Sequence, residues 1–574
     1  RAGRRMYRAL AACVVLLCLA PLLISTSPVP WTAPSPMVDR VARHLDHDSR
    51  ASFKTLAVAE PKPLSPSPGD WVVTGEEVRE DEVITLDGNL IVKSGGNLTL
   101  INCTLYMDCS YVGEWGILVE SGGVMNVLGG SSITAYNPCL NFTFRVYGSL
   151  TMRDSELHFC GYENGLGDWG LWLQTDEGVL IENCTLSENF DGVDCYKASN
   201  IVIRNCTISN NACDGIYCEE SSNIIITDCR IVNNHVDAGW ILGPGNNITI
   251  SHCLILGNYD GFDIEWSLSN VTVSWCNISY NYGTGLHFDE AYYVRVHDVF
   301  FMNNSGSGIY MIDSSNLSIR NCLIYGSGYE GITADWNVTN TVLYNCTIIE
   351  SEGDGFYLSG VNNLTMRKCL IINSGWENYI GGNNTVIDDC VIIGSYDIGL
   401  QLWGSNITVQ NCMVLYNEGD GIYLDECLNV TLSNCTITGN WEDGIDGFRT
   451  SNVTLFNCTI SENHDDGIEL YKCLNVQLLN TTISWNYYYG VWCDNCSNVA
   501  VYGCDITYNW YGIVSEITSG LTIHYCDILS NEEHGLYVVG TYLVNATYNW
   551  WGSSAGPEYK ACLLYTSPSP RDRG

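Results

Sequence analysis

The chain has 574 residues, of which 46% are apolar and 11% aromatic, so it is long enough for several domains or one repeat array and too apolar for a disordered polymer. It carries 64 acidic residues against 25 lysines and arginines, a formal net charge of −39. This charge excludes nucleic-acid recognition through a basic patch and leaves cations, sugars and basic proteins as partners.

Residues 1–24 have the pattern of a signal peptide. Arg4, Arg5 and Arg8 precede an apolar run at 9–24, as a charged region precedes the apolar region of a secretory signal. We therefore expect a secreted or cell-surface protein, periplasmic in a bacterium, or else one held by this segment as an uncleaved anchor. Residues 25–69 contain eight of the 14 prolines and are predicted to form a Pro-rich linker.

From residue 70 the composition changes to that of a sheet. Between 69 and 556 only Pro138 and Pro244 occur. A stretch that long without proline keeps its backbone N–H groups for hydrogen bonds, as stacked strands require. Residues 70–177 hold short alternating apolar segments such as 88–92, 96–100 and 148–152, which we expect to be strands.

A cysteine then recurs at intervals of 21 to 24 residues. Two intervals are double, at 46 residues, and Val299 and Thr481 occupy the vacant slots. The slot is filled by Cys184, Cys206, Cys229, Cys253, Cys276, Cys322, Cys346, Cys369, Cys390, Cys412, Cys435, Cys458, Cys504 and Cys526. Together these positions define sixteen units in one register.

The unit at 429–447 shows what one repeat forms. Val430 and Leu432 alternate as strand residues do, Cys435 lies on a second strand after a bend, and Ile445 opens a third after Asp-Gly. Three strands and three bends make a coil that is too thin to bury its own inward face, so successive coils must stack at about 4.8 Å. Leucine-rich repeats share this period, but their regular leucines and helical arc are missing.

The repeats resemble the right-handed parallel β-helix repeat proteins, whose coils read approximately apolar-x-apolar-x-Asn-Asn-Thr-Ile-x-x-Asn, then Asp-Gly-Ile. The match covers roughly 178–540, and residues 549–557 are similar to the Trp-Gly…Gly-Pro terminus of NosD-type and archaeal surface members. The resemblance implies an all-β, right-handed, single-stranded parallel β-helix of about 23 residues per coil, regular over 178–561 and irregular over 70–177. The family includes polysaccharide lyases, hydrolases, epimerases, adhesins and metallochaperone partners, so it implies no single activity.

Residues 562–574 resemble a translated sequencing adapter. We therefore expect the native C-terminus to be missing, which leaves a C-terminal membrane anchor open.

The cysteines are predicted to form a ladder of small buried thiols. Two further pairs, Cys195 with Cys218 and Cys473 with Cys496, lie one repeat apart and are close enough for disulfides in an exported protein. The lone Cys-x-x-Cys at 493–496 is a weak zinc signal. A second column lies before the glycine turns and consists of Asn417, Asn440, Asn463, Asn486, Asn509 and Asn531. Asparagine accepts left-handed backbone and can bond the coils above and below, which predicts a structural ladder.

Function is expected on the outward positions of the strand that follows the glycine turn. Carboxylates and aromatic rings mix along this face, which suits a sugar polymer because rings pack on pyranose C–H surfaces and acids bond hydroxyls or hold calcium. The candidate ligand-binding rings are Tyr217, Tyr310, Tyr357, Trp403, Tyr423, Tyr471 and Trp492. A solvated sheet face with aromatic residues of high β-propensity is the alternative.

Two groups of acids on adjacent coils stand out. The candidate catalytic residues are Asp263, Glu265, His287 and Asp289, with the acids as bases and the histidine as donor. The candidate Ca²⁺ ligands are Asp443, Asp446, Asp466 and Glu469, because carboxylates about 5 Å apart must share a proton, bind a cation or stay wet. Residues 259–265 resemble the Tyr-Gly-Phe-Asp-Pro-His-Glu stretch of mannuronan epimerases, but Ile264 alone stands where those enzymes have Pro-His.

Three functions follow from these features. The favoured one is an exported, cell-surface β-helix that binds polysaccharide or mediates adhesion, with no required cofactor and Ca²⁺ as the candidate ion. The second is a polysaccharide lyase, glycoside hydrolase or uronate epimerase acting on the same face. The third is an envelope spacer without a ligand, whose acids serve solubility.

Overall fold

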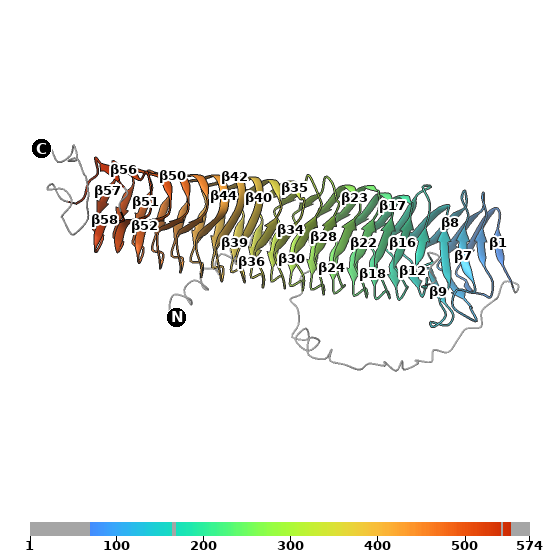
Figure 1. Ribbon diagram of the computed structural model, residues 1–574. Helices are drawn as coiled ribbons and strands as arrows, with labels where there is room; N and C mark the ends of the chain where they lie inside the picture. The colour runs from blue at the N-terminus through green and yellow to red at the C-terminus, as the bar shows by residue number, and fades with distance from the viewer. Residues whose placement is uncertain (1–68, 164–167, 541–542, 553–574) are drawn as a thin grey trace, which may run out of the picture. The chain divides into compact units, whose positions relative to one another are not determined.

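The computed structural model describes residues 69–163, 168–540 and 543–552, so the predicted signal peptide, nearly all of the linker and the adapter-like tail lie outside the described residues. In the described part, parallel strands succeed one another from β1 (Trp71–Val73) to β59 (Asn545–Thr547) and build a solenoid of stacked coils (Figure 1). The predicted all-β parallel solenoid is confirmed. Within the described residues, no helix is long and apolar enough to cross a membrane.

A typical coil has three strands, here called first, second and third. In one coil these are β46 (Ile445–Phe448), β47 (Ser451–Phe456) and β48 (Thr459–Ser461). Each pairs in parallel with its counterpart in the next coil, so that Asp446 lies beside Glu469. The other separate first strands are β4 (Leu90–Val92), β7 (Gly116–Val119), β10 (Thr143–Val146), β13 (Leu171–Leu173), β16 (Val193–Tyr196), β19 (Ile216–Glu219), β22 (Gly239–Leu242), β25 (Phe262–Glu265), β28 (Leu286–Asp289), β31 (Ile309–Ile312), β34 (Ile332–Asp335), β37 (Phe356–Ser359), β49 (Ile468–Tyr471), β52 (Tyr489–Asp494), β55 (Tyr511–Glu516) and β58 (His534–Val539).

Three coils depart from the three-strand pattern. Their first and second strands run together as β40 (Tyr379–Asp388), β42 (Leu400–Gln410) and β44 (Ile422–Ser433). Pairing continues round the corner between β40 and β42 because glycines face each other there, Gly382 against Gly404. The merged strands keep the outward positions of the first strands in line with those of neighbouring coils.

The interior is a continuous apolar column. Its largest fully buried side chains include Phe142, Phe144, Phe262, Phe288, Phe301 and Phe356. Stacking closes this column because every coil covers the inward face of its neighbours, and the buried area provides the main driving force for folding.

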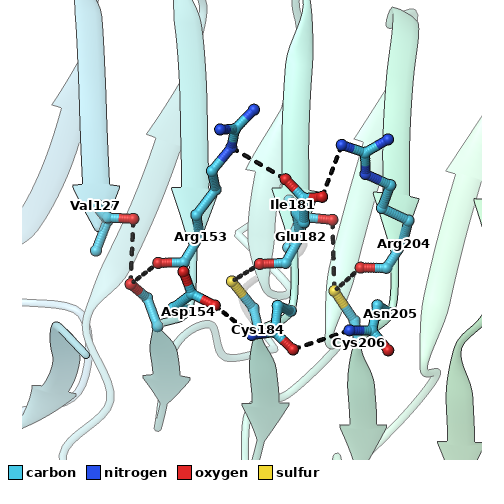
Figure 2. Close-up of polar contacts among 11 residues, drawn as sticks. Val127, Arg153, Asp154, Ile181, Glu182, Cys184, Arg204, Asn205 and Cys206 are labelled. Atoms are coloured by element: carbon cyan, nitrogen blue, oxygen red, sulfur yellow. Dashed lines mark hydrogen bonds and ion pairs between the residues drawn. The ribbon is translucent and has the colours of Figure 1, made fainter. Parts of the chain in front are cut away.

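The cysteine slot satisfies backbone carbonyls at a corner of the coil. The Cys206 thiol donates to the carbonyl of Arg204 at 3.1 Å and lies 3.4 Å from that of Ile181 in the preceding coil (Figure 2). Ser155 holds the same slot in an earlier coil, where its hydroxyl donates to the carbonyl of Arg153 at 2.7 Å and lies 3.1 Å from that of Val127. The predicted ladder of buried thiols is confirmed, and the pairs at 195/218 and 473/496 are free thiols too.

The buried asparagine column forms the predicted ladder between coils. The Asn463 side chain donates to Oδ1 of Asn486 at 2.9 Å and accepts from the side chain of Asn440 at 2.9 Å. The left-handed backbone expected for this column is wrong. Positive φ angles occur instead at corner residues, such as Asn452 and Asn457 near the two ends of β47 and Glu462 after β48.

In most regular coils a glycine stands just before or at the start of the first strand, because neighbouring coils approach each other closely there. A Cβ on Gly444 would lie 2.5 Å from the carbonyl oxygen of Gly467 in the next coil. The same contact recurs from Gly421 to Gly444. Glycine at this point therefore sets the position from which the outward residues of the first strand can be counted.

Candidate functional site

The outward side chains of the first strands form two files, which together are called the first-strand face. One file contains Tyr217, Asp263, His287, Tyr310, Tyr357, Tyr423, Asp446, Glu469 and Trp492. The other contains Glu265, Asp289, Trp403 and Tyr471. The strand register thus places these sequence-predicted residues as neighbours along one face.

Between Tyr217 and Tyr423, two aromatic residues of the first file were missing from the prediction made from the sequence. Trp240 lies between Tyr217 and Asp263, and Tyr379 lies beside Tyr357. Counting from the turn glycine fails at Trp240 because Ala238 occupies that slot and the following glycine is already in the strand. It fails at Tyr379 because that coil has glutamate instead of glycine two residues earlier. Only the strand register finds both.

Asp263, Glu265 and His287 form an acid–histidine cluster. Nδ1 of His287 lies 3.1 Å from Oδ1 of Asp263 and 3.7 Å from Oε1 of Glu265. The indole N–H of Trp240 donates to Oε2 of Glu265 at 3.3 Å. Asp289 pairs in register with Glu265 on the next coil. All four predicted catalytic residues therefore gather on β25 and β28.

The environment shifts the protonation of this cluster. Burial lowers the pKa of His287, but the hydrogen bond and charge of Asp263, with the charge of Glu265, outweigh burial and raise it. Burial also raises the pKa of Glu265, and burial with the charge of Asp263 raises that of Asp260 to about 6. A cationic histidine between carboxylates is a competent proton donor, as general acid chemistry requires.

A hollow adjoins this cluster on the turn side. This turn-side groove has a volume of about 710 Å³ and is lined by Tyr259, Asp260, Tyr282, Gly283, Thr284, Ser305, Gly306, Ser307, Tyr310, Tyr329, Glu330, Thr333, Asp335 and Tyr357. It opens because the turn before β31 carries only serine and glycine at 305–308, whereas Tyr282 and Tyr329 project from the coils on either side with more than 60% of their surface exposed.

The floor of the groove is polar and already organised. The Ser307 hydroxyl lies 3.0 Å from a carboxylate oxygen of Glu330 and 3.0 Å from the Thr333 hydroxyl. At the strand side, the hydroxyl of Tyr310 donates to Asp335 at 3.1 Å. The Tyr310 ring also packs on His287, with centroids 5.0 Å apart. One tyrosine thus connects the groove to the acid–histidine cluster.

A second hollow lies at the opposite edge of the face. It has a volume of about 610 Å³ and is lined by Ile312, Asp313, Trp336, Asn337, Ser359, Gly360, Tyr379 and Trp403. Trp336 is 75% exposed, and Trp403 is 46% exposed. Of the predicted ligand-binding rings, Tyr310 and Tyr357 line the turn-side groove and Trp403 lines this second hollow.

The remaining predicted rings line neither hollow. Tyr217 is only 8% exposed and lies between Trp169 and Trp240, with ring centroids 5.7 and 5.6 Å away. Tyr423, Tyr471 and Trp492 follow further along the face.

The predicted calcium ligands gather only in part. One carboxylate oxygen each from Asp443, Asp466 and Glu469 lies within 4.8 Å of the others, while Asp446 pairs in register with Glu469. Burial and the charges of neighbouring acids raise the pKa of Asp443 to about 10, and burial raises that of Asp466 to about 8. Protons or a cation are the two ways to neutralise this cluster.

Asp443 and Asp466 belong to an aspartate ladder that sequence reasoning missed. A backbone N–H of the next coil donates to Oδ1 of each ladder aspartate, for example Asp466 N to Asp443 Oδ1 at 2.7 Å. The ladder comprises two runs, Asp191, Asp214, Asp237 and Asp260, then Asp420, Asp443 and Asp466. The only sign of this ladder in the sequence is that most of its aspartates are followed directly by glycine.

A family profile described as the right-handed beta helix region matches residues 88–255, 237–348, 336–452 and 443–553. The chain belongs to the right-handed β-helix family. No curated protein matches its sequence.

This β-helix is also similar to solved structures. The mannuronan C-5 epimerase AlgE4 A-module of Azotobacter vinelandii is 13% identical, with 70% of this chain and 91% of that chain covered and a TM-score of 0.29. A double mutant of the periplasmic alginate epimerase AlgG is 11% identical, with 81% and 85% covered and a TM-score of 0.26. The tailspike gp49 of Acinetobacter baumannii bacteriophage Fri1, a capsular polysaccharide depolymerase, is 15% identical, with 45% and 52% covered and a TM-score of 0.29. At these values no residue role is carried over.

Proposed function

We propose that this β-helix binds a neutral polysaccharide in the turn-side groove and along the adjoining first-strand face. The observation that carries the proposal is the groove itself, an elongated hollow flanked by exposed tyrosines over a floor of hydroxyls and carboxylates. Rings such as Tyr282 and Tyr329 can pack on the C–H faces of sugar rings, while Ser307 and Glu330 can bond sugar hydroxyls.

The charge of the groove decides which polymers fit. Its lining residues include Asp260, Glu330 and Asp335 and no lysine or arginine. A polymer of uronates would meet this negative potential without a compensating cation, so repulsion disfavours it. A neutral glycan meets no such penalty. The signal-like residues 1–24 support an exported, cell-surface setting, where such binding would serve adhesion or retention of polymer.

The test is binding of the full chain to a panel of neutral and acidic polysaccharides, measured with and without a chelator. We expect neutral polymers to bind in both conditions. Tyr310→Ala and Tyr329→Ala should each weaken binding about tenfold, the effect of losing roughly 1.4 kcal/mol of ring contact. Tyr487→Ala is the matched control, because this tyrosine is 69% exposed and lies outside both hollows. Equal binding by all three variants, or no binding at all, would refute the proposal.

Catalysis on the same face is the second candidate. The contact of 3.1 Å between His287 and Asp263 beside the groove is the observation that favours it. If this face is catalytic, incubation of the full chain with neutral and uronate polymers should give shorter, unsaturated or epimerised products. Unchanged product formation by the double variant His287→Ala, Asp289→Asn would remove these residues from the role.

Calcium at Asp443, Asp446, Asp466 and Glu469 stays a prediction with its own test. Calorimetric titration with Ca²⁺ should show binding that Glu469→Gln weakens roughly tenfold or more, since the variant loses a charged oxygen ligand. Identical titrations for the variant and the parent chain would contradict it.

A further inference from the structure

A cysteine and two aspartates converge at a place that none of the functions above uses. Asp191 lies in the turn before β16, and Cys213 with Asp214 lies in the turn before β19 on the next coil. The thiol sulfur and one carboxylate oxygen from each aspartate lie within 4.8 Å of one another. These residues line neither the turn-side groove nor the second hollow.

The backbone fixes both carboxylates in place. Oδ1 of Asp191 accepts the N–H of Asp214 at 2.8 Å, and Oδ1 of Asp214 accepts the N–H of Asp237 at 2.9 Å. Each aspartate therefore accepts this ladder bond with Oδ1, and Oδ2 of Asp191 has no hydrogen-bond partner among the described residues. Such orientation by hydrogen bonds is what aligns carboxylate ligands in metal sites.

The second oxygen of Asp191 is the observation that points to a ligand. Asp191 is 1% exposed, and its Oδ2 is buried without a hydrogen-bond partner among the described residues; the Cys213 thiol, a weak donor, faces this carboxylate. Asp194 nearby is fully buried, and within the part of the chain that the structure describes neither of its oxygens has a hydrogen-bond partner. Buried polar groups are nearly always paired, so unpartnered carboxylates in one place require an explanation.

No positive side chain explains them. The ion pairs of the described residues include none with Asp191, Asp194 or Asp214. Burial, together with the charges of neighbouring acids, raises the pKa of Asp191 and of Asp194. Burial, then the charges of Asp214 and Asp191, raises the pKa of Cys213. Protons therefore neutralise these groups when no cation is bound.

We propose that Asp191, Cys213 and Asp214 bind one thiophilic divalent cation, with Zn²⁺ as the best fit. One thiolate and two carboxylate oxygens supply three ligands of the kind that Zn²⁺ takes in tetrahedral sites, whereas Ca²⁺ and Mg²⁺ take oxygen ligands alone. Cys213 is partly exposed, which gives the ion a path from solvent. Water fills the fourth position.

Binding exchanges protons for the metal. The Cys213 thiol gives up its proton to solvent as the sulfur–zinc bond forms, and a protonated Asp191 gives up its own as its oxygen coordinates. The ion joins the turns of two successive coils, so it also stabilises the stacking of β16 on β19.

The experiment uses the full chain, freed of metal by a chelator and titrated with Zn²⁺ in a calorimeter. Cd²⁺ is titrated in parallel, because a cadmium–thiolate bond gives ultraviolet charge-transfer absorption that carboxylate sites lack. The variants are Cys213→Ser and Asp191→Asn. The control is Cys139→Ser, since among the described cysteines only Cys139 and Cys213 are not buried.

We expect Zn²⁺ to bind the parent chain and Cys139→Ser equally and each of the two site variants roughly tenfold or more weakly. The charge-transfer band should disappear in Cys213→Ser and persist in Cys139→Ser. Circular dichroism of the metal-free variants tells lost ligands from lost fold, and Asp191→Asn keeps the size of the side chain should the serine variant misfold. Absence of Zn²⁺ binding by the parent chain, or a band that survives Cys213→Ser, would overturn the proposal.

Discussion

Asp354 offers a direct measure of what a buried acid contributes to the stability of the solenoid. It precedes β37 and is 8% exposed. Burial is the main reason that its pKa rises to about 8, and the charges of Glu377, Glu330 and Asp397 add to the shift. We predict that Asp354→Asn stabilises the protein at neutral pH, because asparagine keeps the shape of the neutral acid and has no charge to bury.

The magnitude follows from the shift in pKa. Below about pH 4 the folded and unfolded states both hold the proton, so wild type and variant should be equally stable. As the pH rises from the unfolded pKa towards the folded pKa of about 8, only the folded state keeps the proton, and wild-type stability falls. At about pH 7 the difference is close to three pH units, or roughly 4 kcal/mol in favour of the variant.

The assay is denaturant unfolding of both proteins at about pH 4 and about pH 7, followed by tryptophan fluorescence. Asp389→Asn serves as the control, since Asp389 is exposed and its neutralisation should change the free energy of unfolding by no more than about 0.5 kcal/mol at either pH. The reasoning fails if Asp354→Asn has the same effect at both pH values, or if the control follows the same pH dependence.

Two substitutions and one labelling experiment test the packing of the interior. Asn463→Ala should lower the free energy of unfolding by roughly 2–4 kcal/mol, because it removes three buried hydrogen bonds to Asn440 and Asn486; smaller losses would show that water replaces the amide. Phe288→Ala should cost roughly 3–5 kcal/mol in the same assay, since the ring is fully buried, and a loss below about 1 kcal/mol would contradict the packed core. Thiol alkylation of the native chain, mapped by mass spectrometry, should label the exposed Cys139 first among the described cysteines, and labelling of the ladder would refute its burial.

The fold could be predicted because one period determines every register in the chain. Cysteines 23 residues apart, such as Cys435 and Cys458, fall in the same inward slot, and a slip by one residue would turn the apolar side chains outward. The same counting brought Asp263 and His287 together, and the structure places them in contact at 3.1 Å. Properties that repeat with the coil are therefore readable from sequence.

The burial of a given side chain and the presence of a groove depend on the sizes of the side chains on neighbouring coils, and these features cannot be predicted from the repeat period. The burial of Tyr217 depends on two tryptophans from other coils, Trp169 two coils earlier and Trp240 on the next coil, and Trp240 lies outside the glycine count. The burial of the ladder aspartates depends on the direction in which each turn points, which the period does not specify. The turn-side groove likewise exists only because residues 305–308 are serine and glycine between two tyrosine-bearing coils.

The groove also coincides with a gap in the aspartate ladder. The first run ends where Asp260 accepts the backbone N–H of Thr284, and the second begins at Asp420. The first two turns of this gap carry Thr284 and Ser307 at the corresponding position, and their short side chains leave the space that the groove occupies. The interruption of the aspartate ladder thus leaves room for the hollow proposed for ligand binding, while the coils stack as they do elsewhere.

Refilling this hollow tests the proposed function with little disturbance to the fold. Tyr282 and Ser305 hold equivalent positions, since each donates its N–H at 2.9 Å to the backbone carbonyl of a buried asparagine in the preceding coil, Asn258 and Asn281 respectively. Ser305→Tyr therefore places a tyrosine in the groove at the position that Tyr282 holds on the preceding coil. Because Ser305 is exposed, the free energy of unfolding should change by about 0.5 kcal/mol or less. We expect this variant to lose polysaccharide binding, while Ser305→Ala, which keeps the hollow, binds as the parent chain does. Binding that survives the tyrosine would show that the ligand lies elsewhere on the first-strand face.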